Sequence, residues 1–376
     1  FGAEGPISRK HNASYMINYR YSTLGFFHLL GISFGTGTAV PDYQDVSFKV
    51  VSNLGKGKVS LFGLGGISSI DLLYSKKDST DLENFYENEG LDIYNKNRQG
   101  VIGLSYFRHV GKNSFIDFTA AADGLQNRST IDTVYTPQGD TRLFERTDFK
   151  NRNYSANLSL GTKFNAKLNT RVGMELRRID FSLHDSVYLS KYGMFFNEYH
   201  DDGHTLLTRA YAEFQYKISP ALSLNAGLHA MALSLNSEFN LEPRASLSFK
   251  PVPGQNFSLG YGNHSKIMPL FVYYRRLDLS ATEYIQPNKD LKMPRAHHVV
   301  ATWDWQLNHN TRIKLEGYYQ HLYQVAIEEK PSTFSMLNNN SFQFVIPDTL
   351  VNSGTGDNKG IELTLERFMD KGFYYL

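Results

Sequence analysis

One short segment of the sequence gathers side chains that could bind a metal ion. Between His200 and His204, two imidazoles and two carboxylates lie within five residues, a donor set that suits a divalent cation. No third cluster in the sequence completes this site, and a solvated loop tip explains the same residues. His297 and His298 are adjacent in a predicted strand, so they point to opposite faces and cannot bind one ion together. We therefore predict no metal site and no cofactor.

Two further patterns could indicate an enzyme. Residues 354–360 are rich in glycine, and such a loop binds phosphate when a helix follows it. Apolar residues instead alternate from Ile361 to Leu365, which predicts a turn followed by a strand. Protease or phospholipase activity would need Asp/His or Ser/His pairs at strand ends, and His184 with Asp185 is only a weak candidate. Because cysteine is also absent, we predict no catalytic residues and no enzyme.

Aromatic residues gather in two segments that we expect to be long loops. Aromatic faces combined with arginine suit sugars, peptides or anionic chelates equally, and packing between loops explains the same residues as well. The candidates for substrate recognition are Tyr192, Phe195, Phe196, Tyr199 and His200 in the first segment, and Phe271, Tyr273, Tyr274, Arg275 and Arg276 in the second.

The elements that position these residues are constrained by composition. The chain has 376 residues, with 39 Lys and Arg against 37 Asp and Glu, and this near-neutrality argues against a nucleic-acid binder. A mean hydropathy of −0.39 and the lack of an apolar run of about 18 residues exclude a membrane-spanning helix. The 24 Tyr, 26 Phe and 30 Gly residues favour β-structure. No linker is visible, so we expect one continuous domain.

Periodicity predicts an all-β fold. Apolar and polar residues alternate in many segments, most clearly in residues 153–161 and 222–230. Short turns alternate with long connections, so we expect an up-and-down antiparallel sheet with one short-looped rim and one long-looped rim. The long connections are expected at 23–42, 66–99, 125–151, 181–204, 265–294 and 326–358.

A transmembrane β-barrel is built in this way, with short turns on one side and longer loops outside the cell. A soluble β-sandwich or propeller is the alternative. Against it, the strands run to about ten residues, as a tilted bilayer-spanning strand needs. Long loops on one rim and aromatic clusters at strand ends, such as Tyr318 with Tyr319, also favour the barrel.

Charged residues inside the predicted strands should face the lumen, because a lipid-facing Arg or Lys at the bilayer midplane costs about 2–4 kcal/mol. We expect them to contact a plug inside the barrel, and a direct role in substrate passage is the alternative. Two sets each share one strand face: Arg171, Glu175 and Arg177, and Arg312, Lys314 and Glu316.

Four stretches, in order, resemble a known family. They are Glu4–Pro6 with Ala13–Ser22, then Pro41–Lys49, then Glu242–Ala245 with Ser258–Ser265, and finally Asn352–Glu366. Together they resemble the barrel of TonB-dependent receptors, the active transporters of the outer membrane, and specifically the type with an N-terminal carboxypeptidase-regulatory-like domain. The resemblance covers essentially the whole chain.

The resemblance implies a 22-stranded barrel closed around an N-terminal plug that carries a TonB box. Neither plug, TonB box nor regulatory-like domain is in this sequence, and about 14–15 strands are expected, the last beginning near Tyr374. We therefore expect residues 1–376 to be a partial barrel domain, because an open strand edge in lipid leaves costly unpaired backbone groups. A self-contained barrel of 14 strands is the alternative, if residues 372–376 form a disordered tail.

The resemblance also implies a function. We expect a multi-pass barrel of a Gram-negative outer membrane that imports a scarce nutrient, namely a ferric siderophore, cobalamin, a peptide or a glycan, with energy coupled through TonB. The alternative is a non-transporting structural or accessory subunit of an outer-membrane complex. The expected partners are outer-membrane lipid and lipopolysaccharide, and TonB through the missing plug region. A surface lipoprotein is a further candidate partner, and no nucleic acid is expected.

Overall fold

A computed structural model shows a protein built almost entirely of strands. It describes residues 1–22, 41–76, 89–135, 139–280, 283–338, 346–370 and 372–375. The strands of the main sheet are β1 (Gly2–Ser8), β2 (Ala13–Tyr21), β3 (Asp42–Leu54), β4 (Gly57–Leu73), β5 (Leu91–Val110), β6 (Ser114–Val134), β7 (Thr141–Lys163), β8 (Leu168–Leu189), β9 (Met194–Lys217), β10 (Leu222–Leu233), β11 (Glu238–Phe249), β12 (Gln255–Ser265), β15 (Arg295–Asn308), β16 (Thr311–Glu328), β17 (Leu350–Asp370) and β18 (Phe373–Tyr375).

The remaining elements are short. A 3-10 helix spans Tyr74–Lys76, and the connection after β12 contains α2 (Leu270–Tyr273) and a two-stranded sheet of β13 (Leu277–Asp278) and β14 (Tyr284–Ile285). Within the part of the chain that the structure describes, no helix has the length and apolar character needed to cross a membrane.

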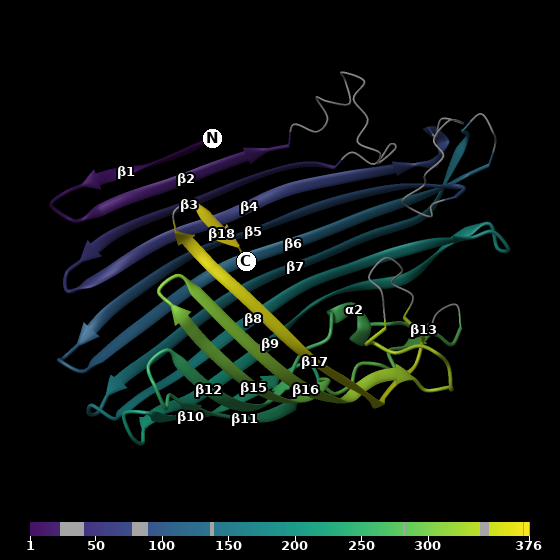
Figure 1. The fold of residues 1–376 in the computed structure, drawn as a ribbon. Coiled ribbons are helices and arrows are strands. Elements are labelled where there is room, and N and C mark those ends of the chain that lie inside the picture. The colour runs from purple at the N-terminus through teal and green to yellow at the C-terminus, as the bar shows by residue number, and fades with distance from the viewer. Residues whose placement is uncertain are drawn as a thin grey trace. The chain divides into compact units, whose positions relative to one another are not determined.

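The sheet has the predicted up-and-down antiparallel topology. Among the described residues it contains 16 strands, and each pairs with its neighbours in chain order from β1 to β12 and then from β15 to β18 (Figure 1). The count exceeds the expected 14–15 because the short strand β1 pairs with β2 although it contains Pro6, a residue that cannot donate a ladder hydrogen bond. The all-β prediction is confirmed.

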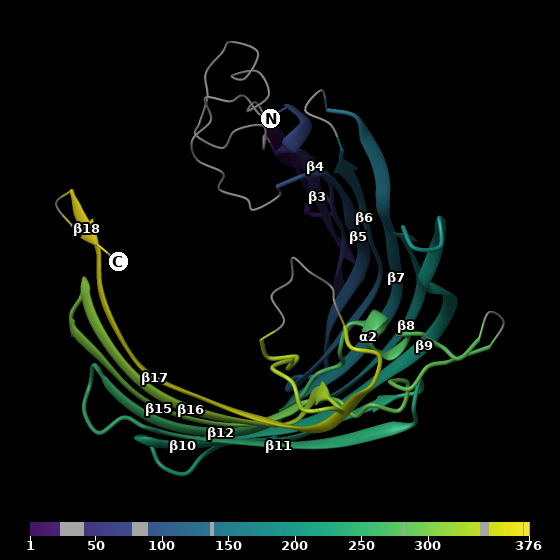
Figure 2. The same cartoon turned by 90° about the vertical axis from the view of Figure 1, so that its right-hand side faces the viewer.

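The chain divides into two compact units. The first comprises Phe1–Arg108, Asp117–Asn157 and Arg177–Leu206, and the second comprises His109–Ile116, Leu158–Leu176 and Leu207–Leu376. In the second unit, Figure 2 shows β11, β12, β15, β16 and β17 side by side, with α2 on their concave side.

Several strands, such as β7 and β10, have one apolar and one polar face. In β10, for example, Leu228 is 44% exposed and lies opposite Pro243 of β11, whereas its neighbour His229 points the other way. Alternate β7 residues Leu158 and Leu160 are likewise exposed, as their alternation predicts. We call the face with exposed apolar side chains the outward face and the polar one the inward face.

The connections differ from the prediction at two places. Residues 125–151 and 181–204 were expected to be long irregular loops, but most of them extend the strands β6, β7, β8 and β9. The β8–β9 connection is only residues 190–193, with Gly193 at φ +66°. The predicted loop at 23–42 lies almost wholly outside the described residues, as do central parts of those at 66–99 and 326–358.

Aromatic rings cover several glycines of the sheet. A Cβ atom added to Gly161 would lie 2.3 Å from the Phe115 ring, and one added to Gly173 would lie 2.5 Å from the Tyr211 ring. A side chain at either position would force the ring that packs on the glycine to move.

Candidate functional site

The inward face of the second unit carries a polar cluster centred on Glu242. The strand β11 alternates, so Glu242 and Arg244 share the inward face, and the antiparallel register places His229 of β10 directly opposite Glu242. The connection between these strands spans only residues 234–237, in which Ser237 has φ +57°. This tight turn fixes the register that brings His229 to Glu242.

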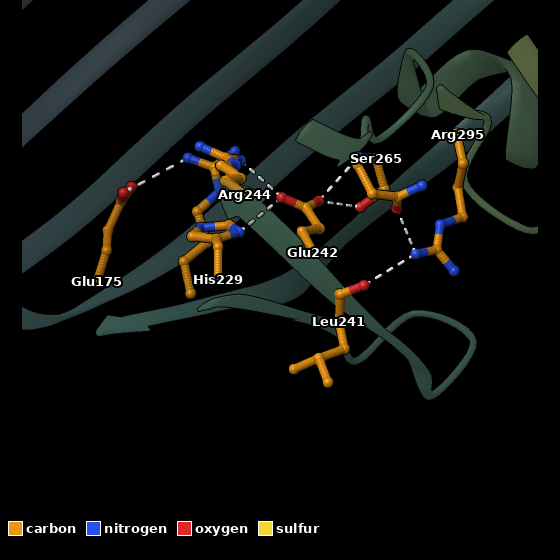
Figure 3. Close-up of polar contacts among 9 residues, drawn as sticks. Glu175, His229, Leu241, Glu242, Arg244, Ser265 and Arg295 are labelled. Carbon is orange, nitrogen blue, oxygen red and sulfur yellow. Dashed lines mark hydrogen bonds and ion pairs between the residues drawn. The ribbon is translucent and has the colours of Figure 1, made fainter. Parts of the chain in front are cut away.

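Both carboxylate oxygens of Glu242 have hydrogen-bond or ion-pair partners. Its side chain is 1% exposed, and its Oε2 atom lies 2.8 Å from both His229 Nδ1 and Arg244 Nη2. Its Oε1 atom accepts hydrogen bonds from the backbone N–H of Ser265, at 2.8 Å, and from the Ser265 hydroxyl (Figure 3). A carboxylate buried to this extent needs such compensation, because desolvation strongly penalises its charge.

Further charged and aromatic groups extend the cluster. At one end of the cluster, Arg209 of β9 donates a 3.4 Å hydrogen bond to Glu175 of β8. At the other end, the Arg295 guanidinium donates to the Leu241 carbonyl oxygen at 2.9 Å (Figure 3). The imidazoles of His264 and His298 meet edge to face, with centroids 4.8 Å apart.

Four residues of the cluster, His229, Arg244, His264 and His298, line a groove of about 970 Å³. Arg244, whose side chain is 45% exposed, offers guanidinium donors to it, while Glu242 holds that arginine in place. Guanidinium groups bind carboxylates and polypeptide carbonyls with charge-assisted hydrogen bonds, so this face can hold a polar polypeptide segment or an anionic solute. Among the described residues, no group of three or more His, Asp or Glu side chains could hold a metal ion.

The charged residues predicted from the strands share one face, as expected. Arg171, Glu175 and Arg177 occupy alternate inward positions of β8, opposite in phase to its exposed apolar residues such as Met174. Arg171 donates to the Ser159 hydroxyl at 3.1 Å. Whether they contact a plug or a substrate remains a prediction.

The second predicted set forms an ion-pair network on β15, β16 and β17. Arg312 binds Asp304 through two nitrogen atoms, at 2.8 and 2.6 Å, and Glu366 through a third, at 3.1 Å. Lys314 lies 2.6 Å from Glu316. All of these side chains lie on the inward face, because the apolar residues Ile313 and Leu315 alternate with them.

The first aromatic segment lies on the β8–β9 hairpin rather than in a long loop. Tyr192 lies in the turn, and Phe195, Phe196, Tyr199 and His200 belong to β9. Tyr199 is 3% exposed and meets Phe149 edge to face, with centroids 5.5 Å apart.

Because the backbone is extended, Tyr199 and His200 point to opposite faces. His200 stacks on His184 at 4.8 Å, and His184 lies 3.2 Å from Asp202. The segment from His200 to His204 is therefore part of a strand, not the solvated loop tip that the sequence suggested.

The second aromatic segment is held by packing and ion pairs. Phe271 and Tyr273 belong to α2, and Tyr273 is fully buried. Burial raises the pKa of the Tyr273 hydroxyl to about 12. Arg275, which follows Tyr274, pairs with Asp348 at 3.1 Å, and Arg276 pairs with Asp278 at 2.6 Å and lies over the Tyr284 ring.

Two asparagines form hydrogen bonds between the start of β17 and the connection that joins β12 to β15. Asn288 is fully buried and its Oδ1 atom accepts the backbone N–H of Leu350 at 2.8 Å. Asn352 accepts the backbone N–H of Lys292 at 2.7 Å and donates to the carbonyl oxygens of Lys292 and Gln324, both at 3.0 Å. The connection is therefore a docked insert, defined here as residues 266–294.

Glu242 was missed as a site residue from the sequence. Its spacing from Arg244 places both on one strand face, but the opposing His229 could be found only from the register of the neighbouring strand. The same applies to Asn352, whose partners are 28 and 60 residues away in the chain.

Comparison with known proteins identifies related barrels. Residues 8–375 match the family described as TonB dependent receptor-like, beta-barrel. No curated protein matches the sequence.

Several solved structures share the fold. The ferric-catecholate import receptor Fiu of E. coli has a TM-score of 0.70 at 11% identity, covering 98% of this chain and 60% of that one. The siderophore receptor PirA of Acinetobacter baumannii has a TM-score of 0.64 at 14% identity, covering 97% and 56%. The copper transporter OprC has a TM-score of 0.64 at 9% identity, covering 96% and 54%. The chain thus spans somewhat more than half the length of each of these proteins.

Proposed function

Because the chain belongs to the TonB-dependent receptor-like β-barrel family, we propose that it forms the substrate-conducting wall of a TonB-coupled nutrient importer. Its place is the outer membrane of a Gram-negative bacterium. The observation that carries the proposal is the division of its strands into an outward apolar face and an inward face with charged clusters, such as that of Glu242. A wall of this kind suits a barrel whose interior holds a polar plug and passes a polar solute.

Within this proposal, the inward groove of the second unit contacts the plug. The groove of about 970 Å³ presents Arg244 and His229, which can exchange hydrogen bonds with a polypeptide surface. TonB then acts through the plug. A surface lipoprotein as an external partner and the N-terminal carboxypeptidase-regulatory-like domain remain predictions.

For the substrate we propose a ferric siderophore first, with cobalamin, a peptide or a glycan as the other candidates. Support comes from two solved structures that share the fold, the ferric-catecholate import receptor Fiu and the siderophore receptor PirA. The copper transporter OprC has the same fold, so the choice must be made by experiment. The aromatic residues around Tyr192 and Phe271 stay candidates for recognition.

The test uses the full-length protein in its native host. A strain lacking the protein is complemented with the wild type or with a variant lacking the TonB box, and uptake is measured with radiolabelled iron–siderophore complexes, cobalamin, peptides and glycans. We expect both the deletion and the TonB-box variant to lose uptake of one class. Unchanged uptake in the TonB-box variant, with the variant present at normal abundance, contradicts energy coupling. If the deletion affects none of the four classes but an outer-membrane complex disassembles, the accessory-subunit alternative holds.

A further inference from the structure

The outward face of the first unit contains a groove that faces the membrane. It has a volume of about 760 Å³ and runs across the strands from β2 to β7. Its outward-pointing side chains include Tyr19, Val46 and Ile67, which are 42%, 40% and 47% exposed. One flank of the groove is thus apolar and aromatic, as the membrane-facing surface of a barrel should be at the level of an aromatic girdle.

Three glycines form the floor of this groove, and the backbone does not require them. Gly65, Gly100 and Gly124 have ordinary strand conformations, and a Cβ atom added to any of them would meet its nearest neighbour at 3.4 Å or more. Gly63 and Gly103 of the same strands differ, because an added Cβ would lie 2.4 Å from a phenylalanine ring. At the floor positions a side chain would fit the fold and would only fill the groove.

The opposite flank of the groove is cationic. Arg98 of β5 and Lys150 and Arg152 of β7 point outward, in phase with exposed apolar residues such as Ile102 and Tyr154 on the same strands. Lys150 lies 3.2 Å from Asp148. Neither Arg98 nor Arg152 has a carboxylate partner within the described part of the chain.

The cations lie on the side of the apolar belt that leads to the β4–β5 and β6–β7 connections, of which the β4–β5 connection is long. On β5, Arg98 lies nearer than Ile102 to the β4–β5 connection. On β7, Arg152 likewise lies nearer than Tyr154 to the β6–β7 connection. Long connections of an outer-membrane barrel lie outside the cell, so these cations face the outer leaflet at the depth of its headgroups. Guanidinium and ammonium groups there attract phosphates, and arginine binds them bidentately.

We propose that this groove is a binding site for a phosphorylated lipid of the outer leaflet. Arg98, Lys150 and Arg152 bind the lipid phosphates, and an acyl chain lies along the glycine floor against Val46 and Ile67. The charge of the rim complements the phosphates, and the apolar floor complements the chain, which a free phosphate ion lacks. The site is independent of the substrate that the barrel transports.

The test measures lipid binding to the full-length protein purified in a phosphate-free non-ionic detergent. The probes are diphosphoryl lipid A, the same lipid after removal of both phosphates, and inorganic phosphate. Native mass spectrometry measures the binding of each probe at graded probe concentrations. The variant Arg98→Gln/Arg152→Gln removes the two unpaired cations. The matched control is Arg108→Gln, because Arg108 lies on the same strand and face as Arg98 but at its opposite end.

We expect diphosphoryl lipid A to bind the wild type and the control equally, and the double variant at least tenfold more weakly. Equal binding by all three proteins, or equal binding of the dephosphorylated lipid, overturns the proposal, as does displacement of the lipid by millimolar inorganic phosphate.

A second variant, Gly100→Leu, fills the floor and keeps every cation. We expect it to fold, as judged by heat-modifiable migration in SDS gels, and to bind diphosphoryl lipid A several-fold more weakly. Unchanged binding by the folded variant contradicts the acyl-chain part of the proposal.

Discussion

His229 and Glu242 face each other across the β10–β11 hairpin, with His229 Nδ1 2.8 Å from Glu242 Oε2. The carboxylate is 1% exposed. It also pairs with Arg244 and accepts a hydrogen bond from the backbone N–H of Ser265. This arrangement makes Glu242 the structural centre of the inward face of the second unit.

Replacing Glu242 with alanine should destabilise the barrel strongly. The substitution leaves the Ser265 N–H without its acceptor and removes the counter-charge of Arg244, which is 45% exposed, and a donor left without its partner costs about 1–3 kcal/mol. We expect the urea midpoint of the full-length protein in detergent micelles to fall accordingly. Glu362→Ala, at an exposed position of β17, is the control and should leave the midpoint unchanged. Equal effects of the two substitutions would show that burial of Glu242 contributes nothing.

Glycine packing gives a second prediction. Gly161→Ala forces a Cβ atom into the Phe115 ring, at 2.3 Å in the present geometry, and such overpacking costs about 1–3 kcal/mol. Gly317→Ala should be neutral, because nothing lies within 4 Å of the added Cβ atom. Thermal unfolding followed by heat-modifiable migration compares the two variants. An equal loss of stability in both would mean that the ring does not restrict position 161.

The Tyr273 hydroxyl should ionise only at strongly alkaline pH. Burial raises its pKa from 10.0 to about 12, so the folded state binds this proton more tightly than the unfolded state. Its contribution to stability is complete below pH 10 and is lost as the pH rises from 10 to about 12. Difference absorbance of tyrosinate in the wild type and in Tyr273→Phe isolates this titration. Identical titration curves for the two proteins above pH 10 would refute it.

Asn352 should hold the docked insert. Asn352→Ala removes three hydrogen bonds to Lys292 and Gln324, each of which is worth about 0.5–1.5 kcal/mol. We expect faster amide hydrogen exchange in residues 266–294, with the exchange of β10 and β11 unchanged. Asn358→Ala on the same strand, which removes only a 3.3 Å contact to Gln320, is the control. If both variants exchange alike, the hydrogen bonds of Asn352 do not hold the insert.

The alternation of residue types predicted much of the fold. Leu228 and His229 point to opposite faces because adjacent strand residues must, and this rule also placed Arg312 and Glu316 on one inward face. The turns were predictable where glycine is needed, as at Gly111, which has φ +68°.

Contacts between side chains on neighbouring strands could not be predicted from the sequence. The pairing of His229 with Glu242 depends on a register that a turn of four residues sets, and the turn's own conformation at Ser237 carries no strong sequence signal. The prediction of a loop around His200 was wrong, because these residues belong to β9. On a strand that extends beyond the apolar belt, polar residues on both faces are compatible with regular pairing.

The length of β8 and β9 has a consequence for immunity. These strands have 22 and 24 residues, whereas about 9–11 residues of a tilted strand cross the hydrocarbon core. Along β8 the exposed apolar residues end at Leu176 and give way to Arg178, so the remainder, with the turn at 190–193, stands above the bacterial surface. We therefore expect this hairpin to be accessible to antibodies and external proteases on the living cell.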